Sequence, residues 1–375
     1  MKEPSNTSNM NSMPRVTCVQ MAAINRYIED NVILPTEIKG NGRRFVWWGR
    51  NNDYPSYLLA LRSEVTTLSA VMEGCVDYCV GNGVRIEGLG GEWEIKVNRY
   101  GHTAEDIVRR MADDLVMFGG FALQVVRNEV GGIAELYHID MRHLRTDEDR
   151  ETFFYSEDFS ERGRYRVSKT LVYPRYIPSG TSASSVYYYN PDFRQVYPSP
   201  MYNAAIKACE IERCTDDFHL TGILNGFVAP YLVNFNNGQP ADDEVKEEIE
   251  EMFSEKFTGP QNAGRVMFSW NNTRESATTI DKLEIEDFGD KYQSLAKHSR
   301  QQIFTAFRAN PNLFGIPTEG SGFSSEEYES AFKLFNRTVI RPMQKSISNA
   351  FAYLFGQDCL AIEPFTLDGN EKREV

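Results

Sequence analysis

The sequence predicts an α+β protein with more than one lobe. Its 375 residues exceed what one compact core usually holds, and 41% of them are hydrophobic, which is enough to form real cores. Helical and β patterns alternate over residues 41–200, whereas from residue 201 on the pattern is mainly helical around one β-containing insert, residues 223–286. This change of pattern indicates two kinds of structure in one chain.

Composition excludes several classes of protein. No segment approaches the roughly 18 consecutive apolar residues of a membrane span, and the N-terminus lacks the basic and apolar regions of a secretion signal. We therefore expect a soluble protein made in a cytoplasm, with no membrane partner. The net charge of −13 disfavours tight binding of duplex DNA, because Lys and Arg supply most of that affinity. The same charge suits a protein past which DNA slides without sticking.

The six cysteines lie inside apolar periodic segments, which predicts reduced thiols rather than a disulfide framework. No histidine stands at ligand spacing near Cys75 and Cys79, or near Cys209 and Cys214. We therefore expect no metal site and no cofactor.

The first elements follow from apolar spacing and from Gly and Pro breaks. Residues 1–40 should form an N-terminal arm and a helix, the latter over residues 14–31. Residues 45–48 predict a strand and residues 51–55 a turn. Apolar residues then recur three or four apart, which predicts one helix that ends at Gly81 and Gly83, and residues 84–97 should form short strands.

The middle of the chain carries a strong hairpin pattern. Thr103 should cap a helix that stops at Gly119 and Gly120. Two β runs around Gly131 and Gly132 then predict a hairpin. Further β runs at residues 152–155, 165–176 and 186–189 complete a mixed lobe over residues 41–200.

Two helices, residues 201–222 and 287–309, flank the insert, which should contain strands at residues 228–234 and 265–270 around an acidic helix. On the second flanking helix, Lys297, Arg300 and Arg308 cluster on a side away from the apolar arc. Two interpretations of this cluster remain open: a solvated face, or a charged ring that faces a channel or a neighbouring subunit.

A loop and a long helix follow. Residues 310–324 are too many for a simple connector and carry several large apolar side chains, so the loop is either packed or functional. Residues 325–356 have the cleanest helical periodicity in the chain. Pro342 should kink this helix, because its ring removes the hydrogen bond to Thr338. Residues 357–375 are predicted to form a short tail.

Common catalytic motifs are missing from the sequence. It contains no GxxxxGK[ST], GxSxG or HExxH, and its five histidines are scattered, so we expect no enzyme activity. Three acidic doublets could in principle hold Mg²⁺, but each lies on a helix or at a helix start, where a solvated face or a dipole partner is the simpler interpretation: Asp113-Asp114, Asp216-Asp217 and Asp242-Asp243.

The aromatic residues Trp47 and Trp48, and the tyrosines of residues 187–189, are expected in the core or in a subunit interface. The interleaved basic residues of a base-stacking platform are sparse around them.

Five strings in this order resemble the portal proteins of tailed bacteriophages, over residues 43–356. They are WWGRNNDYPSYLLAL, FGGFALQVVRNEVGGIAELYHID, YPSPMYNAAIKA, the pair NGFVAPYLVNFNNG and FTGPQNAGRVMF, and IFTAFRANPNLFG followed by SSEEYESAFKLFNRTVIRPMQ. The resemblance implies a portal fold, with a mixed α/β wing (41–200), two stem helices (201–222 and 287–309), a small α/β clip (223–286), a tunnel loop (310–324) and a long kinked tunnel helix (325–356). Because only 19 residues follow Gly356, the helical crown of many members should be minimal or absent.

The resemblance also implies a function. Portals form a dodecameric ring at one capsid vertex, through which double-stranded viral DNA passes without being tightly bound during genome packaging and ejection. The implied partners are the packaging ATPase (terminase large subunit), the head-tail adaptor, the major capsid protein and a scaffold. The protein would act in the host cytoplasm during assembly and then in the virion. Portals catalyse no reaction.

The resemblance assigns roles to four groups of residues. They are the tunnel loop (Asn312, Leu313, Phe314, Ile316, Glu319 and Phe323), the charged stem residues (Lys297, Arg300 and Arg308), the helix kink (Pro342) and the partner-docking clip (Asn225, Tyr231, Asn262 and Arg265). The net charge of −13 also favours a channel for DNA, because a ring of about a dozen such chains would repel DNA except at local basic rings.

Two alternatives remain. A metal-dependent nucleic-acid enzyme would use Asp113 and Asp114, and its Mg²⁺-dependent activity would be lost when they are changed. A virion adaptor or connector differs less, but such proteins are usually smaller and lack the loop and the long kinked helix.

Overall fold

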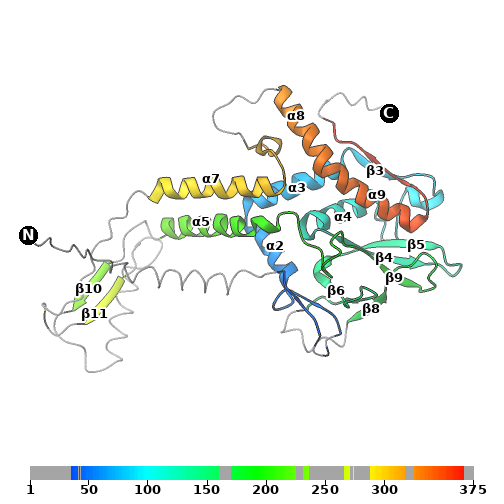
Figure 1. Ribbon diagram of the computed structural model, residues 1–375, viewed down its shortest axis with the longest axis horizontal. Helices are drawn as coiled ribbons and strands as arrows, with labels where there is room; N and C mark the ends of the chain where they lie inside the picture. Colours follow the sequence, from blue (N-terminus) through cyan, green and yellow to red (C-terminus); the bar gives the residue numbers. More distant parts are fainter. Residues whose placement is uncertain are drawn as a thin grey trace, which may run out of the picture. The chain divides into compact units, whose positions relative to one another are not determined.

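A computed structural model describes residues 35–40, 42, 44–159, 170–224, 231–235, 266–270, 273, 288–316 and 325–366. The chain divides into two compact units. Unit 1 comprises Met1–Ala60, Met72–Met201 and Ser324–Val375, and unit 2 comprises Leu61–Val71 and Tyr202–Phe323. Helices and sheets are both present (Figure 1), which confirms the predicted α+β class. The helix expected over residues 14–31 and the acidic helix of the insert lie outside the described residues.

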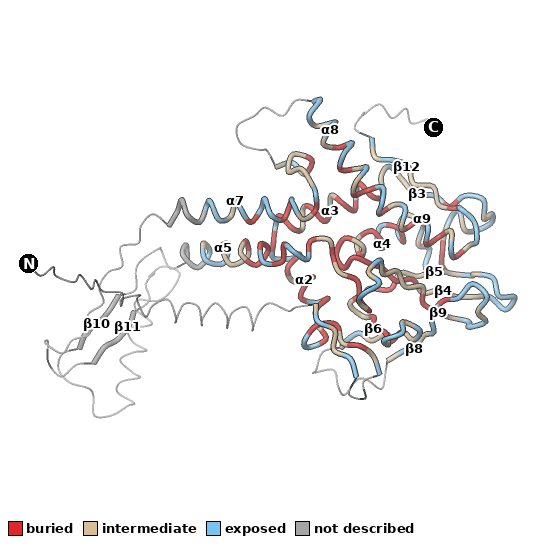
Figure 2. Tube along the Cα trace, in the orientation of Figure 1, coloured by how far each residue is buried: buried red, intermediate tan, exposed pale blue. Residues whose placement is uncertain are grey.

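The centre of unit 1 is a three-stranded antiparallel sheet in the order β5-β4-β9, covered by helix α4. The strands are β4 (Phe121–Arg127), β5 (Ile133–Ile139) and β9 (Ser184–Tyr189). The predicted hairpin is therefore confirmed. Its turn is closed by the Asn128 amide, which accepts a hydrogen bond from the Gly132 N–H. In Figure 2 the buried residues gather around α4 and the strands that it covers.

Helix α4 (Ala104–Phe118) begins and ends where the sequence predicts. Thr103 and Asp106 form a capping box, in which the hydroxyl accepts from the Asp106 N–H and the Asp106 carboxylate accepts from the Thr103 N–H. Gly119 ends the helix in the left-handed region, at a φ of 85°.

Two further sheets of unit 1 lie near Trp47 and Trp48 or contain them. One is β1 (Glu37–Ile38) with β2 (Trp47–Trp48), so the predicted strand is shorter than expected. The other has the order β6-β7-β8, from β6 (Leu144–Thr146), β7 (Thr152–Tyr155) and β8 (Leu171–Pro174). The β8 run begins later than predicted, and residues 160–169 lie outside the described part.

The predicted tail is wrong for its first residues. Strand β12 (Leu360–Glu363) pairs antiparallel with β3 (Gly83–Ile86), so the C-terminal segment completes a sheet with a strand 277 positions earlier in the chain, counted from Leu360 to Gly83. A second expected strand in residues 84–97 is instead the 3-10 turn η1 (Gly91–Glu94). Three glycines with positive φ around it favour a turn over an extended chain, namely Gly88, Gly90 and Gly91.

The long C-terminal helix is built from three segments. They are α8 (Ser325–Phe335), a π-helical turn η7 (Asn336–Ile340) and α9 (Arg341–Phe355). The Arg341 N–H donates to the carbonyl of Asn336, five residues earlier. The disturbance therefore precedes Pro342, which occupies the first turn of α9, where a missing N–H costs little.

The helix expected up to Gly81 is two helices, α2 (Tyr54–Glu64) and α3 (Thr66–Val80), separated at Val65. The apolar spacing continues through the break, which is why it predicted one helix. The new start is held by the Glu212 carboxylate, which accepts from the Thr67 N–H at 3.2 Å and from its hydroxyl at 2.7 Å.

Unit 2 is built on two helices that pack side by side, α5 (Ile206–Leu224) and α7 (Phe288–Ala306). A short turn, η4 (Asn203–Ala205), precedes α5, and another, η6 (Pro311–Phe314), follows α7. In the insert, β10 (Tyr231–Phe235) and β11 (Val266–Trp270) pair in parallel, near the two strands predicted there.

Candidate functional site

The segments that precede α5 and follow α7, the two stem helices, form an apolar contact. The rings of Tyr202 and Phe307 stack with centroids 5.4 Å apart and an angle of 13° between their planes. Ile303, Phe304 and Phe307 are buried. The apolar arc predicted for α7 is thus present near its C-terminal end, whereas Leu295 on the same arc is 39% exposed.

Buried polar groups surround the start of α5. The Arg213 guanidinium pairs with Glu64 at 3.0 Å and with Glu210 at 2.7 Å. The Glu212 carboxylate holds the start of α3 with one oxygen, while its buried second oxygen has no hydrogen-bond partner among the described residues. This helix therefore carries two buried carboxylates, Glu210 and Glu212, of which only the first has an ion-pair partner in the described part of the chain.

The predicted cationic cluster on α7 is reduced to two residues. Lys297 and Arg300 lie on the helix and are exposed. Arg308 does not belong with them, because α7 ends at Ala306 and Arg308 has a φ of 54° in the turn that follows. A wheel drawn through residue 308 assumes a helix that has already ended, so this part of the prediction is wrong.

The first half of the predicted tunnel loop is a packed turn. Asn310 caps η6 by accepting from the Asn312 N–H at 3.0 Å, and Leu313 is only 6% exposed. The Phe314 ring lies 5.8 Å from that of Phe304. Ile316 ends the described part of the loop, and both Glu319 and Phe323 lie beyond it.

Most of the predicted clip residues lie outside the described part of the chain. Tyr231 begins β10, opposite Val266 in the register of the parallel pair. Asn225, Asn262 and Arg265 are outside the described residues, so their expected role in docking stays a prediction.

The acidic doublet of α4 is not arranged as an exposed metal site. Asp114 is buried, and its carboxylate lies 2.7 Å from Nε2 of His138 on β5. Burial raises the pKa of Asp114 to about 6, against the opposing effect of His138. Asp216 and Asp217 are exposed on α5, and Asp242 and Asp243 lie outside the described residues. Within the described residues, no three His, Cys, Asp or Glu side chains form a group that could hold a metal ion.

Of the tryptophan pair, Trp48 belongs to the core of unit 1, one of the two expected placements, whereas Trp47 is half-buried. Trp48 is 1% exposed and stacks on Tyr197 at 4.5 Å with an angle of 4° between the rings. No pattern in the sequence predicted the buried cation beside Trp48. Arg145 is 2% exposed and donates two hydrogen bonds of 2.6 Å to Asn52, one to its side chain and one to its carbonyl. Burial lowers the pKa of Arg145 to about 10.

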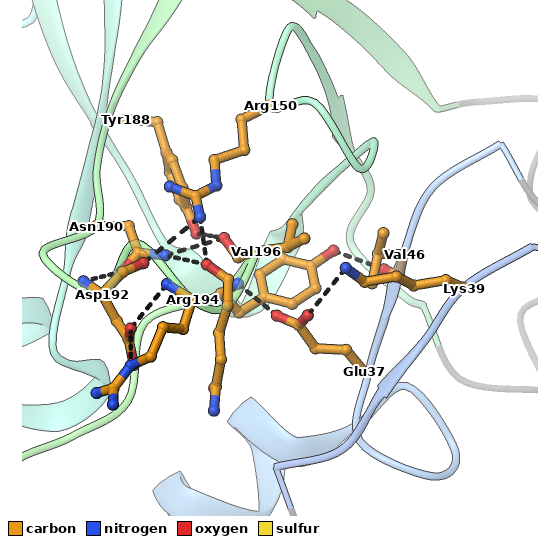
Figure 3. A network of polar contacts seen from close by, with 11 residues as sticks. Glu37, Lys39, Val46, Arg150, Tyr188, Asn190, Asp192, Arg194 and Val196 are labelled. Atoms are coloured by element: carbon orange, nitrogen blue, oxygen red, sulfur yellow. Dashed lines mark hydrogen bonds and ion pairs between the residues drawn. The ribbon is translucent and has the colours of Figure 1, made fainter.

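Figure 3 shows the polar network that fixes the chain between β9 and residue 197. Arg150 donates to the carbonyls of Asp192 and Gln195, and the Tyr188 hydroxyl donates to the carbonyl of Val196 at 3.0 Å. The Asn190 amide donates to the same segment at 3.0 and 3.1 Å. These side chains donate to backbone carbonyls that lie in no β-strand and so have no partner in a sheet. The network therefore holds this loop in place.

The other end of the network ties this loop to the N-terminal sheet of unit 1. The carboxylate of Glu37 accepts from the Tyr197 N–H at 2.7 Å and pairs with Lys39 at 3.6 Å. The Tyr197 hydroxyl donates to the carbonyl of Val46. Tyr188 and Tyr197, which stacks on Trp48, therefore help to hold this loop against the N-terminal sheet.

Five of the six cysteines lie in the described part of the chain, and all five are free thiols: Cys75, Cys79, Cys209, Cys214 and Cys359. Burial raises the pKa of Cys75, Cys79, Cys209 and Cys359. These buried thiols pack as small apolar side chains, as predicted. Among the described residues, no helix is both long enough and apolar enough to cross a membrane.

Sequence comparison identifies relatives of this chain. A sequence profile of phage portal proteins matches residues 96–368. A probable portal protein of Haemophilus phage HP1 (strain HP1c1) is 23% identical over 247 residues, which cover 64% of this chain and 66% of that protein. An uncharacterized protein of Rickettsia felis is 30% identical over 132 residues, 34% of this chain and 32% of that protein. The chain thus spans about a third of this curated relative.

Solved structures share the fold. A chain from the neck of an empty GTA particle, computed with C6 symmetry, is 16% identical and superposes with a TM-score of 0.56, covering 88% of each chain. A chain from the neck of a native GTA particle, computed with C12 symmetry, is 15% identical and superposes with a TM-score of 0.52, covering 90% of this chain and 88% of that one. Since the matched profile takes in well over half of the sequence, the chain belongs to the phage portal protein family.

Proposed function

We propose that this protein forms a homo-oligomeric ring at one vertex of a viral capsid, the channel through which double-stranded DNA is packaged and ejected. The observation that carries the proposal is the family profile over residues 96–368, together with a stem whose surface is incomplete in one chain. The fold is shared with a chain from a particle neck computed with C12 symmetry, which supports a ring of about twelve copies.

The stem surface has the properties of a contact between copies. On α5, Phe218 is 47% exposed and Leu220 is 57% exposed, although side chains of this size are usually buried. Next to them, Asp216 and Asp217 give this end of α5 an acidic surface, whereas Lys297 and Arg300 give α7 a basic one.

A ring brings different surfaces of adjacent copies together, so an acidic face on one helix and a basic face on its partner are complementary. In the proposed ring, α5 of one copy therefore lies against α7 of the next. The packaging ATPase, the head-tail adaptor, the major capsid protein and a scaffold are the proposed partners, with the insert between α5 and α7 as the docking element for the first two. The proposed location is the host cytoplasm during assembly and the portal vertex in the virion.

Charge reversal tests the ring and its stem contact together. Purified wild-type protein should form rings by mass photometry and negative-stain imaging. Changing Asp216→Lys with Asp217→Lys should abolish them, as should Lys297→Glu with Arg300→Glu, because like charges then face each other. Combining all four changes should restore rings. The control Lys207→Glu alters an exposed cation near the start of α5 and should leave rings intact. A folded, strictly monomeric wild-type protein at micromolar concentration would refute the ring, and failure of the combined variant would refute this stem contact.

A further inference from the structure

We propose that one exposed face of the C-terminal helix binds the phosphate backbone of DNA. This inference rests on the proposed function, in which DNA passes close to the ring. The face is a row of four cations, here named the cation row, spaced every four residues along α8, η7 and α9: Lys333, Arg337, Arg341 and Lys345.

Each member of the cation row is exposed to solvent. Lys333 pairs with Glu329 one turn earlier, at 2.9 Å. Among the described residues, no carboxylate lies within ion-pair distance of Arg337, Arg341 or Lys345. In a chain with a net charge of −13, three successive cations without an acidic neighbour are unusual, because carboxylates are available to pair with most of its cations.

The π-helical turn brings the row into line. In an α-helix, residues four apart drift by about 40° per step, because each turn takes 3.6 residues. The turn η7 (Asn336–Ile340) makes an i to i+5 bond and so holds more residues per turn, which reduces the drift between Arg337 and Arg341. The row then extends about 18 Å at about 1.5 Å per residue, which equals the rise of about five base pairs along a duplex axis at about 3.4 Å each.

The row continues into a cavity of about 370 Å³, here named the tyrosine cavity. The next two exposed positions at the same spacing, Asn349 and Tyr353, both line it, together with Tyr187, Tyr176 and Arg175 from β9 and the segment after β8. The Tyr353 ring is 47% exposed and lies 5.7 Å from that of Tyr187 and 6.1 Å from that of Tyr176. The structure thus places Arg175 beside the tyrosines of residues 187–189, around which the sequence has few basic residues.

A nucleic acid fits this arrangement better than an acidic surface of a second copy. Cations at regular spacing along a line match a linear polyanion, and the exposed ring of Tyr353 at the end of the line can stack an unpaired base. Because the rest of the chain is acidic, DNA would be held at this face and repelled elsewhere, which allows it to slide.

The test compares two triple variants with the same loss of charge in the full-length protein. The row variant carries R337Q, R341Q and K345Q. The control carries R85Q, R99Q and R194Q, which remove exposed arginines that already pair with carboxylates. Mass photometry establishes the oligomeric state of each first. Fluorescence anisotropy with a labelled 30-base-pair duplex and a labelled single strand of 30 nucleotides then gives the affinity at several salt concentrations.

The row variant should bind both DNAs at least about tenfold more weakly at low salt, and the slope of log affinity against log salt should fall by about two to three, since each lost phosphate contact removes about one. The control should bind like the wild type. Equal losses in the two variants, or no loss in either, would overturn the proposal. Loss of rings in the row variant alone would also overturn it, by showing that the face contacts a second copy. If the wild type forms no rings, the ring proposal fails. The comparison of DNA affinities between the row variant and the control still tests whether the cation row binds DNA.

A single change tests the tyrosine cavity separately. Tyr353→Leu keeps an apolar side chain but removes the stacking face, so it should weaken single-strand binding about fivefold or more and leave duplex binding unchanged. Unchanged single-strand affinity would contradict the assignment of the cavity as a base site.

Discussion

Helix α4 and the β5-β4-β9 sheet that it covers, here named the α4 sandwich, differ from the stem helices of unit 2 in how their buried polar groups are paired. In the sandwich, α4 is capped at both ends, and its buried carboxylate, Asp114, is paired with His138. In the stem, the second oxygen of Glu212 and the hydroxyl of Ser299 are buried without a hydrogen-bond partner among the described residues, and large apolar side chains remain exposed. A second copy could cover the exposed apolar side chains of the stem, Phe218 and Leu220, but not the two buried polar atoms, which are already closed off within one chain.

The largest expected difference between these regions is in their response to the loss of a phenylalanine. Phe121 on β4 is fully buried, so Phe121→Ala should lower the free energy of unfolding by about 3–5 kcal/mol. Phe218 on α5 is 47% exposed, so Phe218→Ala should change it by less than about 0.5 kcal/mol but weaken ring formation. Urea unfolding, followed by the fluorescence of the buried Trp48, measures the free energy of unfolding. Mass photometry measures ring formation. A stable but ring-deficient Phe121→Ala protein would reverse the comparison.

The next effect is a dependence of the sandwich's stability on pH. The pKa of Asp114 is raised from 3.8 to about 6 in the folded protein, so the native state holds this proton more tightly than the unfolded chain. The resulting stability is present below about pH 4 and is lost as the pH rises through about 6, a change of up to about 3 kcal/mol at about 1.4 kcal/mol per pKa unit.

Asp114→Asn removes this titration. Between pH 4 and pH 7 the variant should therefore gain up to about 3 kcal/mol relative to the wild type, measured as the difference in urea unfolding at each pH. The exposed Asp149→Asn serves as a control that also removes one carboxylate. A constant difference between wild type and Asp114→Asn across this range would show that Asp114 does not titrate in it.

The parts of the fold that could be predicted from sequence are those with local causes. The capped helix α4, the β4–β5 hairpin and helices α5 and α7 follow from spacing, caps and turn residues within a few positions of each element. The parts that were missed have distant causes. The break at Val65 depends on Glu212, which lies 145 residues after Thr67, and β12 becomes a strand by pairing with β3.

The site residues divide in the same way. Arg308 was grouped with Lys297 and Arg300 because a helical wheel carries no information about a positive φ. The cation row has a sequence signal, since Lys333, Arg337, Arg341 and Lys345 recur every four residues in a predicted helix. The lack of an acidic partner for Arg337, Arg341 and Lys345 among the described residues, and the position of Tyr187 beside Tyr353, depend on tertiary contacts, so only the structure could show them.

The smallest expected effect concerns the end of α4, where the sandwich leaves no room for a side chain. A Cβ atom at Gly119 would lie 2.2 Å from the backbone oxygen of Ser199, and the residue has a φ of 85°. Gly119→Ala should therefore lower the free energy of unfolding by about 2 kcal/mol, from backbone strain and from the displaced carbonyl. Gly88 has a similar φ of 76° and open space around it, so Gly88→Ala should cost only about 1 kcal/mol. Equal losses, measured by urea unfolding, would mean that the close approach contributes nothing and that φ alone requires glycine at position 119.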